Sequence, residues 1–352
     1  MKITQLDINI TADHAVVWQE NCLYLLDQRV LPDTEQFIAL HNVEETAQAI
    51  REMVVRGAPA IGVTAAYGVV LAAREAFVES GSQWKHAIVP LLELLEQARP
   101  TAVNLSWAID KMRGFIRAMD SKNPEALLIE KALAIHEEDI AANRAIGDHG
   151  ASLIKQNSGI ITHCNAGALA TGGYGTALGV VRSVHKQGNL TQVFADETRP
   201  WLQGARLTAW ELARDNIPVT LIADGAAASR MAAGGVDWVV VGSDRIAGNG
   251  DVANKIGTYH LVLAAKHHGI KVMVAAPTST VDMSLASGKD IPIEQRDPEE
   301  LLCCGNKRIA AEGVPAWNPV FDITPASLVD AIVTEKGIVL GPDAEKMKKH
   351  MA

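Results

Sequence analysis

The sequence predicts an α/β protein with a C-terminal Rossmann-like doubly wound parallel sheet and a smaller N-terminal domain of antiparallel strands plus helices. From residue 158 onwards, short apolar runs typical of buried strands alternate with helical segments. Residues 3–30 instead alternate apolar and polar side chains between turn residues, as a small antiparallel sheet does. We therefore predict an N-terminal domain at 1–124 and a catalytic α/β domain at 125–352.

The composition argues against several classes of function. The chain has 352 residues, of which 48% are hydrophobic and 21% charged, as in an ordinary globular protein. Its net charge of -9 argues against binding to nucleic acid or to an acidic membrane, because both need a basic surface. We find no apolar run long enough to span a bilayer and no signal-like N-terminus, and therefore expect a cytoplasmic protein. The four cysteines are too few for a disulfide scaffold, and no spacing of cysteine and histidine resembles a zinc site.

The N-terminal domain is predicted to be mostly helical after residue 42. Residues 43–54 form one amphipathic pattern, with Asn42 as its cap. Arg56-Gly57 then stands where a second, apolar helix opens over residues 61–77. This pair is suited to hold a phosphate through backbone N–H groups and a guanidinium, or Arg56 only caps the preceding helix. Arg99 lies at a second break between helices, before the helix over 105–119.

The C-terminal domain is predicted from its alternating pattern. Strands are expected at 159–163, 191–195, 218–223, 236–242, 270–276 and 337–340, with helices at 175–186, 201–214, 226–233 and 253–268. Residues 283–325 contain many Gly and Pro residues and are expected to form a long irregular connection.

The stretch 159–179 is the centre of the pattern. An apolar strand ends on His163-Cys164-Asn165, and a glycine-rich segment and a helix follow. Strand, glycine loop and helix N-terminus would together make an anion cradle, with the Cys164 thiol at its mouth. A single cysteine is more often a small buried hydrophobic residue, but its position at a strand end favours a role in chemistry.

The predicted strand ends gather further polar residues. Ligands of open α/β sheets bind outside the carboxyl ends of the strands. Those ends carry Asp196, Asp224 and Asp244, among others. Asp244 follows a buried strand, which would raise its pKa and suit it to donate a proton; a helix cap or an ion pair with Arg245 is the alternative. Asn254-Lys255 is expected to open the next helix beside the same edge.

A dinucleotide site is a competing interpretation of the glycines. Gly173-x-Gly175 followed by Gly179, with Asp196 or Glu197 after the next strand, resembles the fingerprint of an NAD-dependent dehydrogenase. The glycines come late after the strand, however, and Cys164-Asn165 occupies the space that a pyrophosphate needs. The dehydrogenase is therefore the weaker hypothesis.

Four long motifs resemble one enzyme family, and the resemblance extends over nearly the whole chain. They are RGAPAIG at 56–62, THCNAGALAT at 162–171, ETRPWLQG at 197–204, and GSDRIAGNGD at 242–251 followed by Asn254-Lys255. In this order they are similar to methylthioribose-1-phosphate isomerase, in a superfamily with regulatory subunits of a translation initiation factor exchange complex and with ribose-1,5-bisphosphate isomerase. The resemblance implies a homodimer that acts in methionine salvage on a sugar phosphate, without a metal or redox cofactor.

The resemblance also implies roles for individual residues. Cys164 and Asp244 match the catalytic pair of the family. The substrate-binding set matches Arg56, Gly57, Ala58, Arg99, Gln203, Asn254 and Lys255. An isomerase of a related pentose 1-phosphate and a non-catalytic regulatory subunit remain as alternatives. The joint presence of Cys164, Asp244 and the two arginines favours an enzyme.

Overall fold

The computed structural model describes residues 2–4, 10–100, 102–120, 122–305 and 307–352. The chain divides into two compact units. The helical unit comprises Met1–Asn143 and Gly167–Gly175, and the sheet unit comprises Arg144–Ala166 and Thr176–Ala352. The division lies within helix α5 (Glu125–Ala151), whereas the sequence analysis placed a boundary just before that helix.

An antiparallel sheet opens the helical unit. In the described part of the unit its order is β1-β4-β3-β2. The strands are β1 (Lys2–Thr4), β2 (Val16–Gln19), β3 (Cys22–Leu26) and β4 (Phe37–Leu40). All side chains of β3 are buried, because this strand lies between two others and packs on the helices. The predicted small N-terminal sheet is thereby confirmed; the part of the prediction that falls on residues 5–9 lies outside the described residues.

Between the N-terminal sheet and residue 151, the described residues form five α-helices: α1 (Val43–Arg51), α2 (Ala58–Ser80), α3 (Trp84–Glu96), α4 (Val103–Ala118) and α5. Asn42 caps α1 as predicted, since its Oδ1 accepts a hydrogen bond from the Glu45 N–H at 2.8 Å. The largest buried side chain of the unit is Trp84, at the first turn of α3.

We expected no apolar run long enough to span a membrane, and by the criteria of length and composition this expectation was wrong. Among the described residues, Ala58–Glu96 contains a window that is long and apolar enough. Most of that window is buried inside the protein, because Ala, Val and Gly side chains let the other helices approach α2 closely. Gly62 illustrates this packing, since a Cβ there would lie 3.0 Å from the Asn104 carbonyl oxygen. A core helix of a soluble protein passes the same test.

The sheet unit is built on a parallel sheet whose order, over the described residues, is β17-β16-β11-β8-β5-β6-β7. The strands are β5 (Ser158–Thr162), β6 (Leu190–Asp196), β7 (Val219–Ile222), β8 (Trp238–Val241), β11 (Lys271–Ala275), β16 (Ala331–Thr334) and β17 (Gly337–Leu340). Only β17 among them runs antiparallel to its neighbour. The predicted doubly wound sheet is confirmed, and β16 is a strand that the prediction missed.

The chain reverses direction across this sheet beside β5. It first moves outward from β5 to β6 and β7, then returns to pair β8 with β5 and continues through β11 to β16. The topological switch point therefore lies between β5 and β8. In open α/β sheets this is the position where ligands bind, outside the carboxyl ends of the strands.

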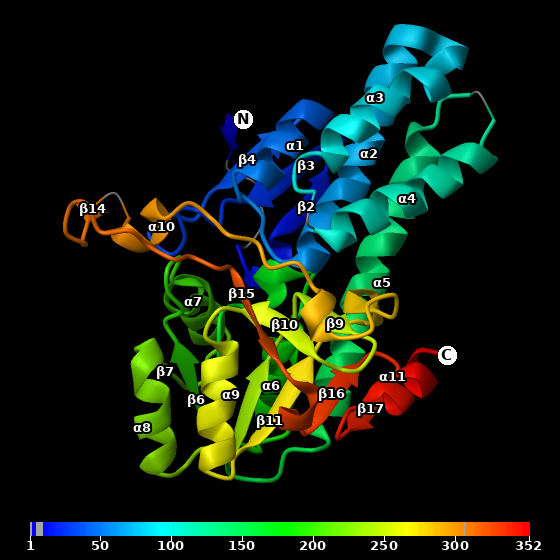
Figure 1. Cartoon of the computed structure of the whole chain (residues 1–352). Coiled ribbons are helices and arrows are strands. Elements are labelled where there is room, and N and C mark those ends of the chain that lie inside the picture. The colour runs from blue at the N-terminus through cyan, green and yellow to red at the C-terminus, as the bar shows by residue number, and fades with distance from the viewer. Residues whose placement is uncertain (1, 5–9, 101, 121, 306) are drawn as a thin grey trace. The chain divides into compact units, whose positions relative to one another are not determined.

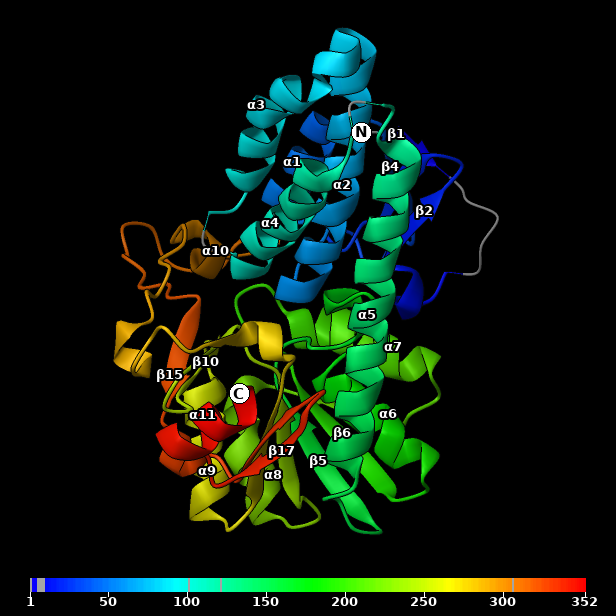
Figure 2. The ribbon, with the colours of Figure 1, turned by 90° about the vertical axis from the view of Figure 1, so that its right-hand side faces the viewer.

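Helices cover both faces of the sheet because successive residues of each strand point to opposite sides. On β8, Val239 and Val241 pack with α8 (Ala227–Ala232), α9 (Thr258–His267) and α11 (Ala344–Met351). Trp238 and Val240 pack instead with α6 (Ala177–Lys186), α7 (Ala209–Arg214) and the end of α5. Figure 2 shows β5 and β6 between these two helix layers.

A second, smaller sheet follows β8 and has the order β12-β9-β10-β15. Its strands are β9 (Arg245–Ala247), β10 (Val252–Lys255), β12 (Val281–Asp282) and β15 (Phe321–Thr324). β15 belongs to the stretch predicted as irregular, which also contains α10 (Glu299–Leu302), β13 (Cys303–Cys304) and β14 (Lys307–Arg308).

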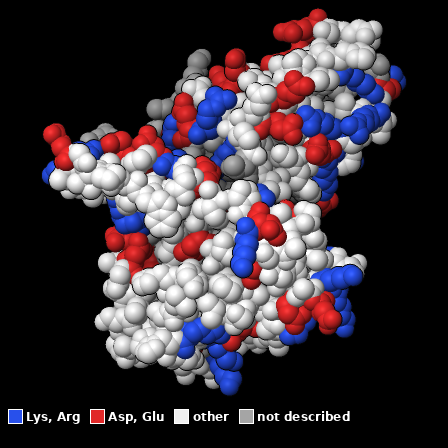
Figure 3. Space-filling model, in the orientation of Figure 1, with Lys and Arg blue, Asp and Glu red and all other residues white. Residues whose placement is uncertain are grey.

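The charged side chains of the surface are of both signs. On the face that Figure 3 shows, Lys and Arg side chains are interspersed with Asp and Glu. This distribution, together with the net charge of -9, gives that face no continuous basic surface for nucleic acid.

Candidate active site

The two predicted catalytic residues follow the two strands that flank the switch point. Cys164 comes two residues after the end of β5, and Asp244 comes three residues after the end of β8. These strands are parallel neighbours, with Ile161 opposite Val239. The chain segments that leave them remain close, since a Cβ on Gly242 would lie 2.5 Å from the Ala166 Cβ. The structure thus places Cys164 and Asp244 in the segments that follow two adjacent strands, at the same edge of the sheet.

Cys164 has a strained and tightly held backbone. Its φ is 61°, in the left-handed region that residues with a Cβ seldom occupy. The Cys164 N–H donates to Thr198 Oγ1 at 2.8 Å, and the Thr208 hydroxyl donates to the Cys164 carbonyl at 2.6 Å. Cys164 and both threonines are buried. Such strain costs about 1–3 kcal/mol and persists only where the surroundings over-determine it, which is typical of functional sites.

The end of β6 is shaped by the ETRPWLQG motif. Thr198 has a φ of 64°, and its N–H donates to Asp224 Oδ1 at 2.7 Å. Gly204 opens a π-helical turn, Gly204–Thr208, and a Cβ on it would lie 1.6 Å from the Asp196 carbonyl oxygen. Only glycine fits there, so the motif's last residue lets the turn pack onto the strand end. π-helical turns are frequent at functional sites.

Gln203 lies immediately before this turn. Its Oε1 is buried and has no hydrogen-bond partner among the described residues. A buried amide oxygen without a partner costs free energy, which a hydrogen bond from a ligand or a water would recover. This is consistent with the predicted substrate-binding role of Gln203, which stays a prediction.

A buried ionic network holds Asn165, on the other side of Cys164. The Asn165 Nδ2 donates to Glu211 Oε1 at 2.9 Å, and Arg182 pairs with Glu211 Oε2 at 3.0 Å. Burial lowers the pKa of Arg182, but the charges of Glu211 and Asp215 outweigh it, so the pKa is raised. Glu211 and Arg182 were not among the predicted site residues, because both lie within helices and belong to none of the quoted motifs.

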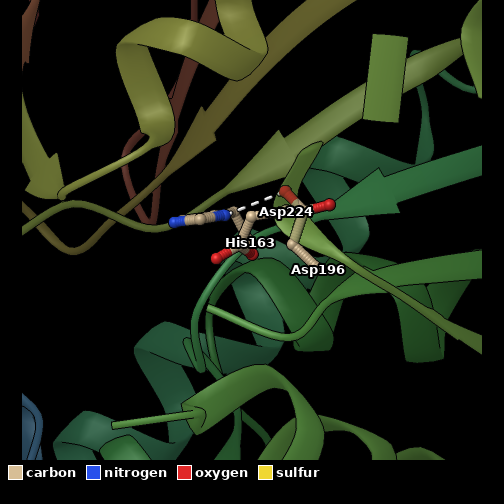
Figure 4. A group of neighbouring side chains, drawn as sticks. All are labelled: His163, Asp196 and Asp224. Carbon is tan, nitrogen blue, oxygen red and sulfur yellow. Dashed lines mark hydrogen bonds and ion pairs between the residues drawn. The ribbon is translucent and has the colours of Figure 1, made fainter. Parts of the chain in front are cut away.

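His163 and Asp196 form a second buried pair at the same edge. His163 Nδ1 lies 2.9 Å from Asp196 Oδ2, and both side chains are 2% exposed. Figure 4 shows these two side chains with Asp224 at the ends of neighbouring strands. Burial lowers the pKa of His163, but the hydrogen bond and charge of Asp196 raise it more. Burial also raises the pKa of Asp196, against the effect of His163. The pair therefore retains its protons more tightly than isolated side chains would.

These three side chains are also the cluster that could be considered for a metal ion. Their ligand atoms lie within 4.8 Å of one another. Most of their ligand atoms already have a partner in the protein, however, and among the described residues only Asp196 Oδ1 of this cluster has none. His163 faces Asp196, and both oxygens of Asp224 accept backbone N–H groups, from Thr198 and Arg199. This donor set is used for structure and does not resemble an open metal site.

The small sheet brings Asp244 beside Asn254 and Lys255. The Asp244 N–H donates to the Ala253 carbonyl at 2.9 Å, which continues the pairing of β9 with β10. Asn254 is buried and its Nδ2 donates to Thr258 Oγ1 at 2.9 Å. Lys255 Nζ lies 5.0 Å from the centre of the Phe321 ring. The expectation that Asn254-Lys255 opens a helix was wrong, because these residues end β10 and the helix begins at Thr258.

The remaining predicted binding residues lie in the helical unit. Gly57 has a φ of 94° and is the N-cap of α2, so Arg56 and Ala58 flank a helix N-terminus. Arg99 lies between α3 and α4, where its carbonyl accepts a hydrogen bond from the Ala102 N–H. A helix N-terminus offers N–H groups and a positive dipole end to an anion. The phosphate-binding role of these residues stays a prediction.

Residues 172–175 of the glycine loop do not contribute free N–H groups to the expected anion cradle. The residues Gly167–Gly175 belong to the helical unit, and the backbone N–H groups of 172–175 are used by the protein itself. The acceptors are Asp139 Oδ2 for Gly172 (2.7 Å), Thr171 Oγ1 for Gly173 (3.2 Å), Asp13 Oδ1 for Tyr174 (2.6 Å) and the Gly173 carbonyl for Gly175 (2.8 Å). These groups have no free N–H for a phosphate, which argues equally against the dinucleotide fingerprint.

Comparison with known proteins gives a family for the whole chain. A family model described as "Initiation factor 2 subunit family" matches residues 54–341. A methylthioribose-1-phosphate isomerase of Nitrosococcus oceani is 56% identical over 344 residues, which cover 96% of this chain and 99% of the relative.

Solved structures resemble the whole chain as well. The crystal structure of 5-methylthioribose 1-phosphate isomerase from Pyrococcus horikoshii has 45% identity and a TM-score of 0.90, covering 96% of this chain and 95% of that one. A structure described as translation initiation factor eIF-2B, subunit delta, from A. fulgidus has 42% identity and a TM-score of 0.87, covering 96% and 98%.

Proposed function

Because this chain belongs to the initiation factor 2 subunit family, within the group of methylthioribose-1-phosphate isomerases, we propose that it converts 5-methylthio-α-D-ribose 1-phosphate into 5-methylthio-D-ribulose 1-phosphate in methionine salvage. One observation carries the proposal. Cys164, which is buried and has a strained backbone, and Asp244 follow the ends of two adjacent strands at the switch point of the sheet. A regulatory subunit that only binds partners does not require this pair.

The chemistry explains why an acid and a thiol are needed. The phosphate on the anomeric oxygen prevents the sugar from opening by loss of a hydroxyl proton. The ring C–O bond must therefore break with the phosphate retained, and Asp244 is the group that protonates the ring oxygen. The hydrogen on C2 then moves to C1, and the C2 hydroxyl becomes the ketone. Atoms and electrons balance within the substrate, so the reaction consumes no external oxidant.

Cys164 acts at C2, as the base or as the group that polarises the C2 oxygen. Its backbone is held by Thr198 and Thr208, which fixes the thiol relative to the strand end. Such preorganisation lowers the activation free energy by several kcal/mol in a reaction that needs aligned groups. Proton transfer through an enolate-type intermediate and hydride transfer both remain compatible with this arrangement.

A direct assay tests the proposal. Purified protein, free of nucleotides, is expected to convert 5-methylthioribose 1-phosphate into the ketose without NAD, ATP or added metal, as followed by NMR of the product. A chelator should leave the rate unchanged. Alkylation of the thiol should stop turnover, and substrate should protect against it, because Cys164 would lie beneath the sugar. Turnover that requires a nicotinamide cofactor would contradict the proposal.

A panel of pentose 1-phosphates separates the related alternatives. A preference for a substrate that carries a second phosphate would indicate a different isomerase. Absence of turnover on every sugar phosphate would favour the regulatory subunit, an alternative supported by the 42% identity to the A. fulgidus protein. The homodimer and the cytoplasmic location are further proposals, of which the first is tested by light scattering in solution.

A further inference from the structure

His163 is a buried, ionisable residue of the THCN segment that the proposed reaction does not use. Its ring makes two hydrogen-bond contacts, one on each nitrogen. Nδ1 lies 2.9 Å from Asp196 Oδ2, and Nε2 lies 2.8 Å from the Ile256 carbonyl oxygen. The ring thus joins the end of β5 to the end of β6 and to the segment that follows β10.

The chemistry of the partners determines where the protons lie. A carbonyl oxygen can only accept, so His163 Nε2 must carry a proton. Nδ1 then faces a carboxylate oxygen, and this contact is favourable only if a second proton lies between the two atoms. The loss of that proton would bring the lone pair of Nδ1 against those of Asp196. Intact contacts on both sides of the ring therefore require a protonated pair.

The peptide unit between Ile256 and Gly257 is held on both sides. Its carbonyl accepts from His163, and its N–H donates to Asp322 Oδ2 at 2.8 Å. Gly257 has a φ of 102°, and a Cβ there would lie 2.9 Å from the His163 ring. Glycine at this position is what allows the ring to approach. The held peptide directly follows Lys255, which ends β10 beside Asn254.

Several ionisable groups act on this pair. Asp196 and Asp224 lie at the ends of β6 and β7, while Cys164 adjoins His163 just after the end of β5. Asp322 on β15 and His260 on α9 act from the small-sheet side. Acidic groups predominate, so a positive charge on the imidazole is favoured at this position.

We propose that His163 is a positioning residue, which Asp196 keeps protonated so that its two hydrogen bonds clamp the Cys164 end of β5 to the Asn254-Lys255 end of β10. The clamp sets the distance between the thiol and the binding residues that follow Asp244. The inference rests on the proposed isomerase function, because it assigns His163 a role at the same site. His163 itself does not touch the substrate.

Substitution of Asp196 by asparagine distinguishes a positioning role of the His163–Asp196 pair from a role in proton transfer. In Asp196→Asn the amide can donate to Nδ1 of a neutral ring, and Nε2 still donates to Ile256, so both contacts survive. We expect this variant to keep kcat/KM within about fivefold of the wild type, which is the effect of one weakened hydrogen bond. Asp196→Ala leaves Nδ1 without its partner and should lower kcat/KM about 100-fold through misplacement. Equal impairment of the two variants would overturn the proposal.

The split between kcat and KM separates positioning from simple loss of folded protein. His163→Ala should lower kcat, because Cys164 is misplaced, and raise KM, because Asn254 and Lys255 are misplaced. Rates are divided by the amount of protein whose Cys164 can be alkylated. His149→Ala is a matched control, since His149 Nδ1 contacts the Thr334 carbonyl at 3.0 Å, elsewhere in the sheet unit. It should change neither constant. Normal constants in the folded fraction of His163→Ala would contradict the clamp.

NMR of ¹⁵N-labelled histidine tests the clamp without any turnover. Wild-type His163 should show protons on both ring nitrogens, and they should persist to a pH above the ordinary titration of histidine. Asp196→Asn should retain the Nε2 proton and lose the one on Nδ1. A wild-type His163 without a proton on Nε2 would overturn the proposal. If the protein shows no isomerase activity but this signature is present, the proposed function fails while the hydrogen-bond clamp stands.

Discussion

Two neighbouring stretches of the chain, 163–165 and 167–175, differ in what their residues do. The first lies at the end of β5, where buried polar side chains pair with carboxylates on other elements. The second is rich in glycine, belongs to the helical unit, and uses its backbone N–H groups on protein acceptors. The glycine of this loop that packs most closely is Gly175, where a Cβ would lie 2.5 Å from the Gly167 backbone.

The difference teaches how to weigh two sequence signals. Glycine density indicates that backbone must approach something closely, and here that neighbour is the protein itself. Polar side chains at the end of an apolar strand indicate a site, because their burial is costly unless their geometry is used. Both signals occur within 13 residues of this chain, and only the second carries chemistry in the proposed reaction.

The largest effect is expected at the strand ends. Cys164→Ser and Asp244→Asn should each lower kcat by about 10³-fold, because each removes a group that acts on the reacting atoms. Thermal unfolding should stay close to that of the wild type, since neither change creates a cavity. Near-normal turnover in either variant would remove that residue from the mechanism.

The helical unit should affect binding instead. The N–H groups of residues 172–175 are occupied, and phosphate binding by Arg56 and Arg99 stays a prediction. Arg99→Ala should raise KM about 10- to 100-fold with a smaller effect on kcat, which corresponds to a lost hydrogen bond to a charged group. Steady-state kinetics measures this. An unchanged KM would show that the phosphate lies elsewhere.

A glycine of the loop should affect stability and not chemistry. A Cβ at Gly172 would lie 2.6 Å from His136 Cδ2, so Gly172→Ala should lower the free energy of unfolding by about 1–3 kcal/mol. Gly114→Ala is the matched control, because among the described residues no atom beyond the neighbouring backbone of α4 lies within 4 Å of a Cβ there, and alanine favours the helix by up to about 1 kcal/mol. Chemical denaturation compares the two. A fall in kcat larger than the fall in stability would place Gly172 in the site after all.

The smallest effect is expected at Asp251, a residue of the GSDRIAGNGD motif whose hydrogen-bond partners hold the fold together. Asp251 accepts hydrogen bonds from the Gly288 and Ala326 N–H groups and from Asn249. Burial raises the pKa of Asp251, but these bonds outweigh it, so the pKa is lowered. A lowered carboxylate pKa stabilises the fold above the ordinary value of about 3.9, and the contribution is lost as the pH falls through the folded pKa.

Asp251→Asn should therefore unfold more easily at neutral pH, by about 1–2 kcal/mol. The difference from the wild type should shrink at acidic pH, below the ordinary aspartate pKa. Thermal melts across pH measure it, with Asp343→Asn at the exposed N-cap of α11 as the comparison. A difference that does not depend on pH would contradict the assigned role of the charge.

Most of the fold and part of the site could be predicted because their signals are local. The central strands β5, β6 and β8 were found from apolar runs, and Cys164 and Asp244 follow from the positions where those runs end. The pairing of β9 with β10 could not be found in this way, since both strands are short. Asn254-Lys255 was therefore assigned to a helix, although the two residues end an antiparallel strand.

The residues that support the site have no local signal. Asp196 could be placed at a strand end, but its pairing with His163 spans 33 residues. Glu211 is a buried carboxylate within α7 that partners Asn165 at a separation of 46 residues. Nothing in the sequence around either acid shows which side chain it faces.

The sequence by itself determined most of the strands and helices along the chain, their apolar faces and the positions of the reactive residues, because these depend on neighbouring residues and on the periodicity of apolar side chains. Only the tertiary structure decided that the chain reverses between β5 and β8, that the glycine loop joins the helical unit, and that His163 binds Asp196 and Ile256. These outcomes depend on which distant groups meet and share hydrogen bonds. Burial removes water as a hydrogen-bond partner, so a buried polar group needs a partner that the protein supplies from elsewhere in the chain.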